Sequence, residues 1–160
     1  MKNSIIAAAV LFAIATPVSY ADLILGAKVG PMLVSFDDNE TSSDPTNVGL
    51  TLGYDFPLRS GIIGFEAEIT RSVESGEVNG TLLDVESQGI YASYSTTGPI
   101  YFKAKIGIMD ASLVAGDLSE DEGGETYGLG VGYRVNNIKL ELEYTSIDDD
   151  VAFISFGIVY

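Results

Sequence analysis

The chain has 160 residues, a length that suits one domain, and its 8 basic and 23 acidic side chains give a formal net charge of −15. It contains no Cys and no His, which excludes a Ser-His-Asp triad, thiol chemistry, disulfides and an ordinary zinc site. The acidic excess argues against nucleic-acid binding, because basic side chains are needed to neutralise phosphates.

Residues 1–21 are typical of a secretory signal peptide. Lys2 supplies the positive start, and residues 5–15 form an apolar run that is too short for a membrane helix. Ser19 and Ala21 are small residues at the positions that precede a cleavage site. We therefore expect the chain to be exported and cleaved after Ala21; an uncleaved N-terminal anchor is the alternative.

Residues 22–160 form the predicted domain, in which apolar and polar side chains alternate almost throughout. The stretch Ile138-Lys-Leu-Glu-Leu-Glu-Tyr144 shows the period of two that indicates a strand. The alternation predicts eight strands, over residues 23–36, 48–56, 62–74, 82–94, 99–111, 126–135, 138–147 and 151–160. Each is close to or longer than the ~9–11 residues that a tilted membrane strand needs.

The fourth predicted strand has an irregular pattern. Leu83 and Val85 lie on one parity, whereas Ile90 and Tyr94 lie on the other. A β-bulge shifts the parity of a strand by one residue, so we expect a bulge near Ser87-Gln88-Gly89.

The predicted connections alternate in length. They comprise residues 37–47, 57–61, 75–81, 95–98, 112–125, 136–137 and 148–150. The first, third and fifth of these are longer loops, and the connections between them are short turns. An even number of strands, with short turns at one end and longer loops at the other, is the plan of an outer-membrane barrel. The sequence therefore predicts an all-β fold, an eight-stranded antiparallel transmembrane barrel with an up-and-down meander.

Two features indicate that the polar face of the strands lines the lumen. Glycines such as Gly128, Gly130 and Gly132 gather on that face, and small residues suit the crowded interior of an eight-stranded barrel. The same face carries five basic and five acidic residues: Lys28, Asp55, Glu66, Glu68, Lys103, Lys105, Arg134, Lys139, Glu141 and Glu143. We expect these charges to pair, because an unpaired buried charge is costly. The alternatives are an ordinary solvated face and a soluble barrel with its apolar face inside.

The acidic excess gathers in the longer loops and in the last connection. Thirteen acidic residues lie there: Asp37, Asp38, Glu40, Asp44, Glu77, Asp117, Glu120, Asp121, Glu122, Glu125, Asp148, Asp149 and Asp150. These connections hold no Lys or Arg, and the short turns hold no acid. We therefore expect one end of the barrel to be strongly acidic.

Calcium binding by this end has only weak support. The stretch Asp117-Leu-Ser-Glu-Asp-Glu-Gly123 departs from an EF-hand loop, since Gly comes one place late and Gly128 stands where the loop needs Glu. We expect no defined metal site and at most weak divalent-cation binding, at Asp117, Asp121, Asp148, Asp149 and Asp150.

The last third of the chain resembles the small outer-membrane β-barrel family of OmpA, OmpX and Ail type. The resemblance rests on Tyr127-Gly-Leu-Gly-Val-Gly-Tyr-Arg-Val135, the turn Asn136-Asn137, the strand from Ile138 to Tyr144, and the ending Phe156-Gly-Ile-Val-Tyr160. In that family such a glycine-rich strand precedes a short periplasmic turn. The rest of the chain agrees with the family in strand pattern.

The resemblance implies a location in the outer membrane of a Gram-negative bacterium, with both ends of the domain in the periplasm and the acidic loops outside. It implies that Phe156, Ile158 and Tyr160 form the C-terminal signal for the barrel-insertion machinery, with Tyr160 where Phe is more usual. Aromatic girdles are expected at both membrane interfaces, with Tyr101 and Phe102 on the periplasmic side.

The resemblance implies adhesion, host-factor binding or envelope integrity, and we expect neither an enzyme nor a cofactor. The expected partners are outer-membrane lipid, lipopolysaccharide, the insertion machinery and an external partner that the sequence does not name. Arg71 lies on the apolar parity near the outer end of the third strand, so we predict that it contacts lipopolysaccharide phosphates; extension into solvent is the alternative. The other functional hypotheses are a soluble periplasmic barrel with an apolar ligand and a narrow porin-like channel, although a charged lumen leaves little open space.

Overall fold

The computed structural model of the chain describes residues 21–35, 42–116, 118–148 and 150–160. All but the last residue of the predicted signal peptide lies outside this described part, as does Phe36 at the end of the first predicted strand. Among the described residues, no helix is long and apolar enough to cross a membrane. The described chain is built from β-strands, as the alternation predicts.

The strands in the described part are β1 (Asp22–Val34), β2 (Ser42–Ser43), β3 (Thr46–Pro57), β4 (Ile62–Glu74), β5 (Gly76–Val78), β6 (Thr81–Ser95), β7 (Ile100–Ala115), β8 (Leu118–Val135), β9 (Ile138–Ser146) and β10 (Val151–Val159). Eight of them are long and correspond to the eight predicted strands. The two short ones, β2 and β5, lie in the connections that follow β1 and β4.

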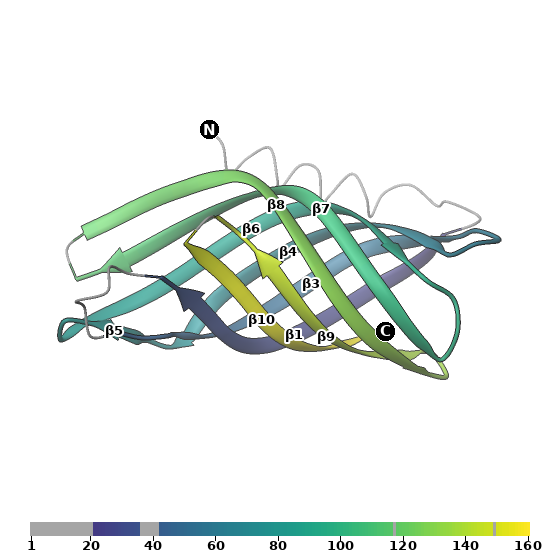
Figure 1. Cartoon of the computed structure of the whole chain (residues 1–160), viewed down its shortest axis with the longest axis horizontal. Coiled ribbons are helices and arrows are strands. Elements are labelled where there is room, and N and C mark those ends of the chain that lie inside the picture. The colour runs from purple at the N-terminus through teal and green to yellow at the C-terminus, as the bar shows by residue number, and fades with distance from the viewer. Residues whose placement is uncertain (1–20, 36–41, 117, 149) are drawn as a thin grey trace.

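The eight long strands form one closed antiparallel sheet (Figure 1). Each pairs with the long strands before and after it, and β10 pairs with β1, where Gly26 lies opposite Val159 and Val29 lies opposite Phe156. The strands run obliquely to the long axis of the barrel, as closure of a sheet requires. The predicted eight-stranded antiparallel barrel is confirmed.

The two ends of the barrel differ. At the turn end, short connections join β3 to β4, β6 to β7 and β8 to β9, and this end also holds the start of β1 and the end of β10. At the opposite end, called the hairpin end, β7 and β8 continue as one paired hairpin to Ala115 and Leu118. Figure 1 shows this hairpin reaching well beyond the shorter strands β9 and β10.

Two of the predicted loops are wrong. The predicted loop over residues 112–125 is mostly paired strand, because the β7–β8 ladder continues through it. Within the predicted loop over residues 75–81, β5 pairs with the start of β6 through a turn at Asn79-Gly80. Both turn residues have positive φ, 51° and 82°, which is the hairpin geometry that an Asn-Gly pair favours.

The expected β-bulge at residues 87–89 is also wrong. Strand β6 pairs in unbroken register with β4 and with β7 through this segment. Its side chains alternate regularly, so Leu83 and Val85 point into the barrel while Ile90 and Tyr94 point outward. The sequence pattern changes here because the interior of the barrel changes from polar to apolar along the strand, and the backbone does not shift.

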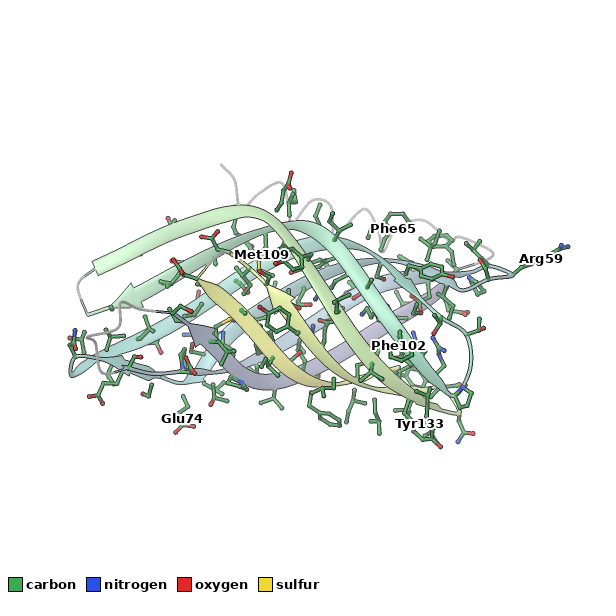
Figure 2. All side chains as sticks on the ribbon, in the orientation of Figure 1. Arg59, Phe65, Glu74, Phe102, Met109 and Tyr133 are labelled. Atoms are coloured by element: carbon green, nitrogen blue, oxygen red, sulfur yellow. The ribbon has the colours of Figure 1, made fainter. Side chains whose placement is uncertain are left out.

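The outer wall of the barrel is apolar. Every long strand exposes large apolar side chains, for example Leu25, Leu50, Phe65, Ile90, Phe102, Tyr133, Leu142 and Phe156. Figure 2 shows Phe65 and Tyr133 pointing away from the barrel, with Arg59 at the turn end. Of the two expected girdle residues Tyr101 and Phe102, Phe102 points outward, whereas Tyr101 points inward and is only 1% exposed, so the predicted place of Tyr101 on the outer wall is wrong.

Candidate functional site

The inner charge network fills the lumen toward the turn end. It consists of Lys28, Asp55, Glu66, Glu68, Lys103, Lys105, Lys139, Glu141 and Glu143. Because alternate residues of a strand point to the same face, strands β1, β3, β4, β7 and β9 each direct their charged side chains inward. The structure thus brings together nine of the ten residues that the sequence assigns to a charged lumen.

Two lysines and two glutamates form the centre of the network. Lys28 Nζ lies 2.7 Å from Glu68 Oε2 and 2.9 Å from Glu143 Oε1. Lys105 Nζ lies 3.1 Å from the same Glu68 oxygen and 2.6 Å from the same Glu143 oxygen. Since the Lys105 and Glu68 side chains are fully buried, each charge depends on its partners to offset the loss of hydration.

Lys103 extends the network toward the turn end. Its Nζ lies 2.8 Å from Glu66 Oε2, 3.3 Å from Glu141 Oε2 and 3.5 Å from Glu143 Oε2. Ser93 donates a hydrogen bond of 2.6 Å to Glu66 Oε1, so both oxygens of this buried carboxylate have partners. Lys103 therefore links three carboxylates that come from two strands, β4 and β9.

Lys139 and Asp55 form a further pair, with Nζ 2.5 Å from Oδ2. Their side chains are 18% and 12% exposed, so this pair lies nearer to solvent than the centre of the network. Because this pair is only partly buried, its removal should lower the free energy of unfolding less than removal of a charge at the centre of the network.

Arg134, the tenth residue of the predicted set, contacts backbone carbonyl oxygens and an aromatic ring and, among the described residues, forms no ion pair with the carboxylates of the network. Its guanidinium donates hydrogen bonds to the carbonyl oxygens of Thr96 and Gly98 and lies 3.9 Å from the centroid of the Tyr101 ring. Tyr101 in turn donates a hydrogen bond to Glu141 Oε1. Arg134 thus ties the connection between β6 and β7 to the barrel, and the Tyr101 side chain connects Arg134 to Glu141 of the network.

The charged part of the lumen is nearly full. The cavity between the side chains of the network has a volume of about 20 Å³, which is room for about one water molecule. Long, paired side chains occupy the rest of the space. A path for ions through this part of the lumen would require the network to rearrange.

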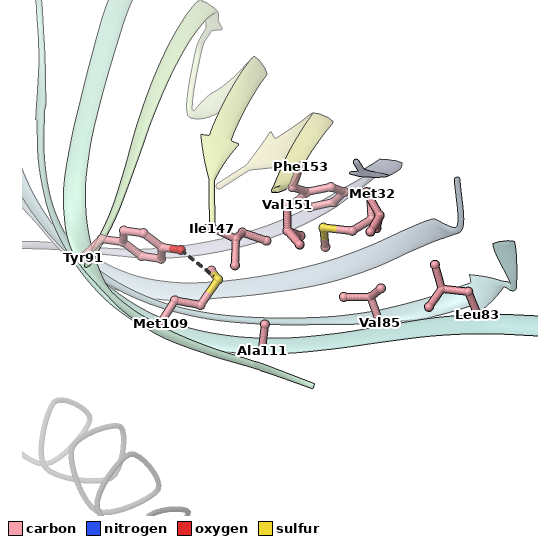
Figure 3. Close-up of a cluster of buried hydrophobic side chains, with 10 residues drawn as sticks. Met32, Leu83, Val85, Tyr91, Met109, Ala111, Ile147, Val151 and Phe153 are labelled. Atoms are coloured by element: carbon pink, nitrogen blue, oxygen red, sulfur yellow. Dashed lines mark hydrogen bonds between the residues drawn. The ribbon is translucent and has the colours of Figure 1, made fainter. Parts of the chain in front are cut away.

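The outer apolar cluster fills the lumen toward the hairpin end (Figure 3). It contains Met32, Val34, Leu83, Val85, Tyr91, Met109, Ala111, Ile147, Val151 and Phe153. Met32, Val85 and Phe153 are at most 1% exposed, so the cluster is closely packed. Tyr91 marks the boundary between the two parts, because its hydroxyl contacts Met109 Sδ at 3.7 Å while its ring centroid lies 4.1 Å from Lys105 Nζ.

The alternation of exposure excludes the soluble-barrel hypothesis. Leu142 is 53% exposed and Ile154 is 36% exposed, whereas Glu143 between the outward-facing Leu142 and Tyr144 is 3% exposed. A soluble barrel with an apolar ligand inside requires the opposite arrangement. An apolar outer wall around a charged interior is the arrangement of a membrane barrel.

The described acidic residues of the hairpin end are exposed. They include Asp44, Glu77, Asp121, Glu125, Asp148 and Asp150. Asp37, Asp38, Glu40, Asp117 and Asp149 lie outside the described residues, as do the side chains of Glu120 and Glu122. Within the described part of the chain, no three acidic side chains come together as a metal site, and weak divalent-cation binding stays a prediction.

Arg71 and the end of β10 lie on the outer wall. The Arg71 side chain is 77% exposed, and its Nε lies 3.1 Å from Glu86 Oε1. Phe156, Ile158 and Tyr160 all point outward and are at least 50% exposed. These positions leave all four side chains accessible from the membrane or its interfaces.

The sequence also held a signal for Tyr101, which the prediction placed on the outer wall. Tyr101 shares the parity of Lys103 and Lys105, so strict alternation places it inside. A Cβ at Gly132 would lie 2.2 Å from Cζ of Tyr101, which shows that the ring rests directly on this glycine.

The chain is similar to known outer-membrane proteins over nearly its whole length. The family model for the outer membrane protein beta-barrel domain matches residues 4–160. Among solved structures, Ail, the attachment invasion locus protein of Yersinia pestis in complex with the heparin analogue sucrose octasulfate, has a TM-score of 0.58 and 16% identity, with 87% of this chain and 94% of that chain covered. Neisserial surface protein A has a TM-score of 0.51 and 16% identity, with 87% and 97% covered. These likenesses concern the fold, and no curated protein matches the chain with significance.

Proposed function

Because the chain belongs to the outer membrane protein beta-barrel family, we propose that it spans the outer membrane as an up-and-down barrel after export and cleavage of residues 1–21. The uninterrupted apolar wall supports this proposal, since membrane strands must present apolar side chains to lipid. Both ends of the domain would then face the periplasm, with the hairpin end outside. Phe156, Ile158 and Tyr160 would serve as the signal for the insertion machinery.

We propose that the protein is non-enzymatic and acts at the cell surface through its acidic hairpin end, in adhesion or in the integrity of the envelope. The observation that carries this proposal is the β7–β8 hairpin, which continues to Ala115 and Leu118 while β9 and β10 end earlier. A nearly full lumen supports a role outside the barrel, because it offers no ready path for transport.

The charge of the hairpin end narrows the chemistry of an external partner. The Ail structure holds sucrose octasulfate, a polyanion. In this chain the exposed side chains Glu77, Asp121, Glu125 and Asp148 would repel such a ligand. We therefore propose a partner with a basic surface, and association that weakens as salt concentration rises.

The proposed orientation can be tested by labelling single cysteines, since the native chain contains none. Ser119→Cys places a thiol on the exposed hairpin, and Ser60→Cys places one in an exposed turn at the opposite end. On intact cells a membrane-impermeant maleimide should label the first variant and not the second. Labelling of Ser60→Cys before permeabilisation, or failure of Ser119→Cys to label, contradicts the orientation.

The proposed role of the hairpin can be tested with cells that carry either the native protein or the double variant Asp121→Asn/Glu125→Gln. We expect cells with the native protein to adhere strongly to a surface coated with poly-lysine. Cells with the double variant, whose hairpin has lost two negative charges, should adhere less. The matched control is Ser119→Ala, which leaves the charge unchanged. Equal adherence of all three strains, together with normal insertion, would contradict an electrostatic surface role and favour a structural element of the membrane.

A further inference from the structure

The seam between β1 and β10, which closes the barrel, is interrupted at Pro31. Residues 26–29 of β1 pair with residues 156–159 of β10 and form the inner seam, while residues 32–34 pair with residues 151–153 and form the outer seam. The shared register places Pro31 opposite Ile154, yet this described seam has no pair at Gly30 or Pro31. The neighbouring ladders, β1–β3 and β9–β10, continue without a break.

The interruption follows from the missing N–H of proline. Leu25 and Tyr160 donate to each other across the seam, and alternate residues of β1 from Leu25 onward, Pro31 among them, direct their backbone groups toward β10. Pro31 cannot donate to the carbonyl oxygen of Ile154, which lies against Gly30, where an added Cβ would collide with it. Lipid offers no replacement donor, so the seam is weakened at this point.

The two parts of the seam hold different side chains inside the barrel. On the inner seam, Lys28 is bound to Glu68 at 2.7 Å and to Glu143 at 2.9 Å, so separation of the strands there would expose charges to lipid at high cost. The inward side chains of the outer seam are all apolar and belong to the outer apolar cluster (Figure 3): Met32, Val34, Val151 and Phe153. Lipid tails are as apolar as these side chains, so the outer seam can open toward lipid without a hydrophobic penalty.

The outer seam is also short. Beyond its three residue pairs, the Ser35 N–H donates to the carbonyl oxygen of Asp150 at 2.8 Å, and the strands then end at the hairpin end of the barrel. Pro31 separates this segment from the inner seam. Opening the outer seam therefore breaks few hydrogen bonds and leaves the inner charge network intact.

We propose that the outer seam is a lateral opening through which an alkyl chain enters the apolar half of the lumen from the bilayer. Met32 and Phe153 move apart with their strands, and the alkyl chain takes their place against Val85 and Met109 on the far side of the cluster. The inference rests on the proposed insertion into the outer membrane, because in water the exposure of the cluster would oppose opening.

The experiment uses the full mature chain, folded into phosphatidylcholine vesicles that contain a fatty acid with a photoreactive diazirine near the end of its chain. Labelled residues are identified by peptide mass spectrometry after illumination. Val85 and Met109 point inward and are at most 4% exposed, so their label, called interior labelling, requires entry of the chain. Ile108 points outward and is 59% exposed, so its label reports contact with the wall alone. We expect both kinds of labelling in the native protein.

Two disulfide locks separate the outer seam from the inner seam. Leu33→Cys/Ala152→Cys closes the outer seam, and Ala27→Cys/Ile158→Cys closes the inner seam as the matched control. Residues directly opposite in an antiparallel pair have Cα atoms about 4.5–5.5 Å apart, which a disulfide can bridge, and the native chain has no Cys. Oxidation of the outer lock should lower interior labelling about tenfold and reduction should restore it, because the disulfide holds the two strands together. The inner lock should leave interior labelling unchanged, and neither lock should change the label on Ile108.

The role of Pro31 itself is tested by Pro31→Val, which restores the N–H opposite the carbonyl oxygen of Ile154. We expect this variant to lower interior labelling about fivefold, the change expected from one regained backbone hydrogen bond. The matched control is Thr46→Val, which changes the neighbour of Pro31 on β3 and leaves the seam as it is. Interior labelling that is absent from the native protein, or unchanged by both the outer lock and Pro31→Val, would overturn the proposal.

The outcome can be separated from that of the proposed function. Each variant is first tested for a heat-dependent shift in gel mobility and for recovery in the outer-membrane fraction. If the native chain inserts and only its outer wall is labelled, only this inference fails. If the native chain does not insert at all, the proposed function fails with it.

Discussion

The two halves of the lumen are both filled with side chains, but the side chains are charged in one half and apolar in the other. Toward the turn end, Lys105, Glu68 and Glu143 are buried as mutually paired charges. Toward the hairpin end, Met32 and Phe153 are buried among other apolar side chains. In both halves the interior is filled, because an eight-stranded barrel is only wide enough to hold its own side chains.

This difference shows that the interior of a membrane barrel need not have one polarity. Along β6, the inward positions change from Tyr91 and Ser93 near the network to Leu83 and Val85 near the hairpin end. Alternation therefore identifies which residues share a face of a strand. The surroundings of that face, whether lipid, paired charges or a packed cluster, decide which side chains it carries.

The largest expected effect comes from removing a charge at the centre of the network. Glu143→Gln keeps the shape of the side chain but leaves Lys28 and Lys105 without one of their two carboxylate partners. We expect a loss of about 3–5 kcal/mol in the free energy of unfolding, because buried charges would remain without full compensation. Urea unfolding in detergent micelles, followed by circular dichroism, measures the change.

A more exposed member of the network provides the control for this prediction. Glu141 is 12% exposed and contacts Lys103 at 3.3 Å, so Glu141→Gln should destabilise the barrel less than Glu143→Gln. Equal effects of the two substitutions would mean that burial does not set the strength of the network.

In the apolar half, Phe153→Ala should lower the free energy of unfolding by about 3 kcal/mol, since it removes a large buried side chain and leaves a cavity. The same urea titration measures the loss. Raising the salt concentration should change the stability difference between variant and native protein very little, because no charge is involved. A difference below about 1 kcal/mol would show that the cluster is not closely packed.

A smaller effect is expected where the wall meets the ring of Tyr101. In Gly132→Ala the added Cβ would lie 2.2 Å from Cζ of Tyr101, so the ring must move away from Arg134 and Glu141. We expect a loss of about 1–3 kcal/mol. Gly157→Ala is the control, since its Cβ would meet its nearest neighbour at 3.4 Å, and a comparable loss there would refute the steric explanation.

The last prediction is an absence of effect. Phe153→Ala opens space only in the apolar half, and the charged half retains its cavity of about 20 Å³. Neither the native protein nor this variant should therefore give a stable conductance in planar lipid bilayers. A stable current through the native protein would contradict the closed lumen, and one that arises only in Phe153→Ala would show that the apolar cluster alone closes it.

The accuracy of the sequence predictions follows the environment of each segment. The predicted strand over residues 62–74 coincides with β4, because lipid on one side and a polar lumen on the other impose a clear alternation. Strand β8 begins at Leu118, eight residues before its predicted start at residue 126. Its outer part carries the exposed acidic residues Asp121 and Glu125 instead of outward apolar side chains, so no apolar face remains to show the period of a strand.

The sequence by itself determined the number of long strands, favoured the polar face as the inward one and identified nine of the ten predicted lumen charges, because these features follow from a period of two and from the cost of burying an unpaired charge. Only the tertiary structure decided which charges meet, since Lys28 and Glu143 are brought within 2.9 Å by closure of the sheet and by its register. Closure also joined Met32 and Phe153 into one cluster. These neighbours are far apart in the chain, and the stagger between strands, which no local pattern encodes, sets their distances.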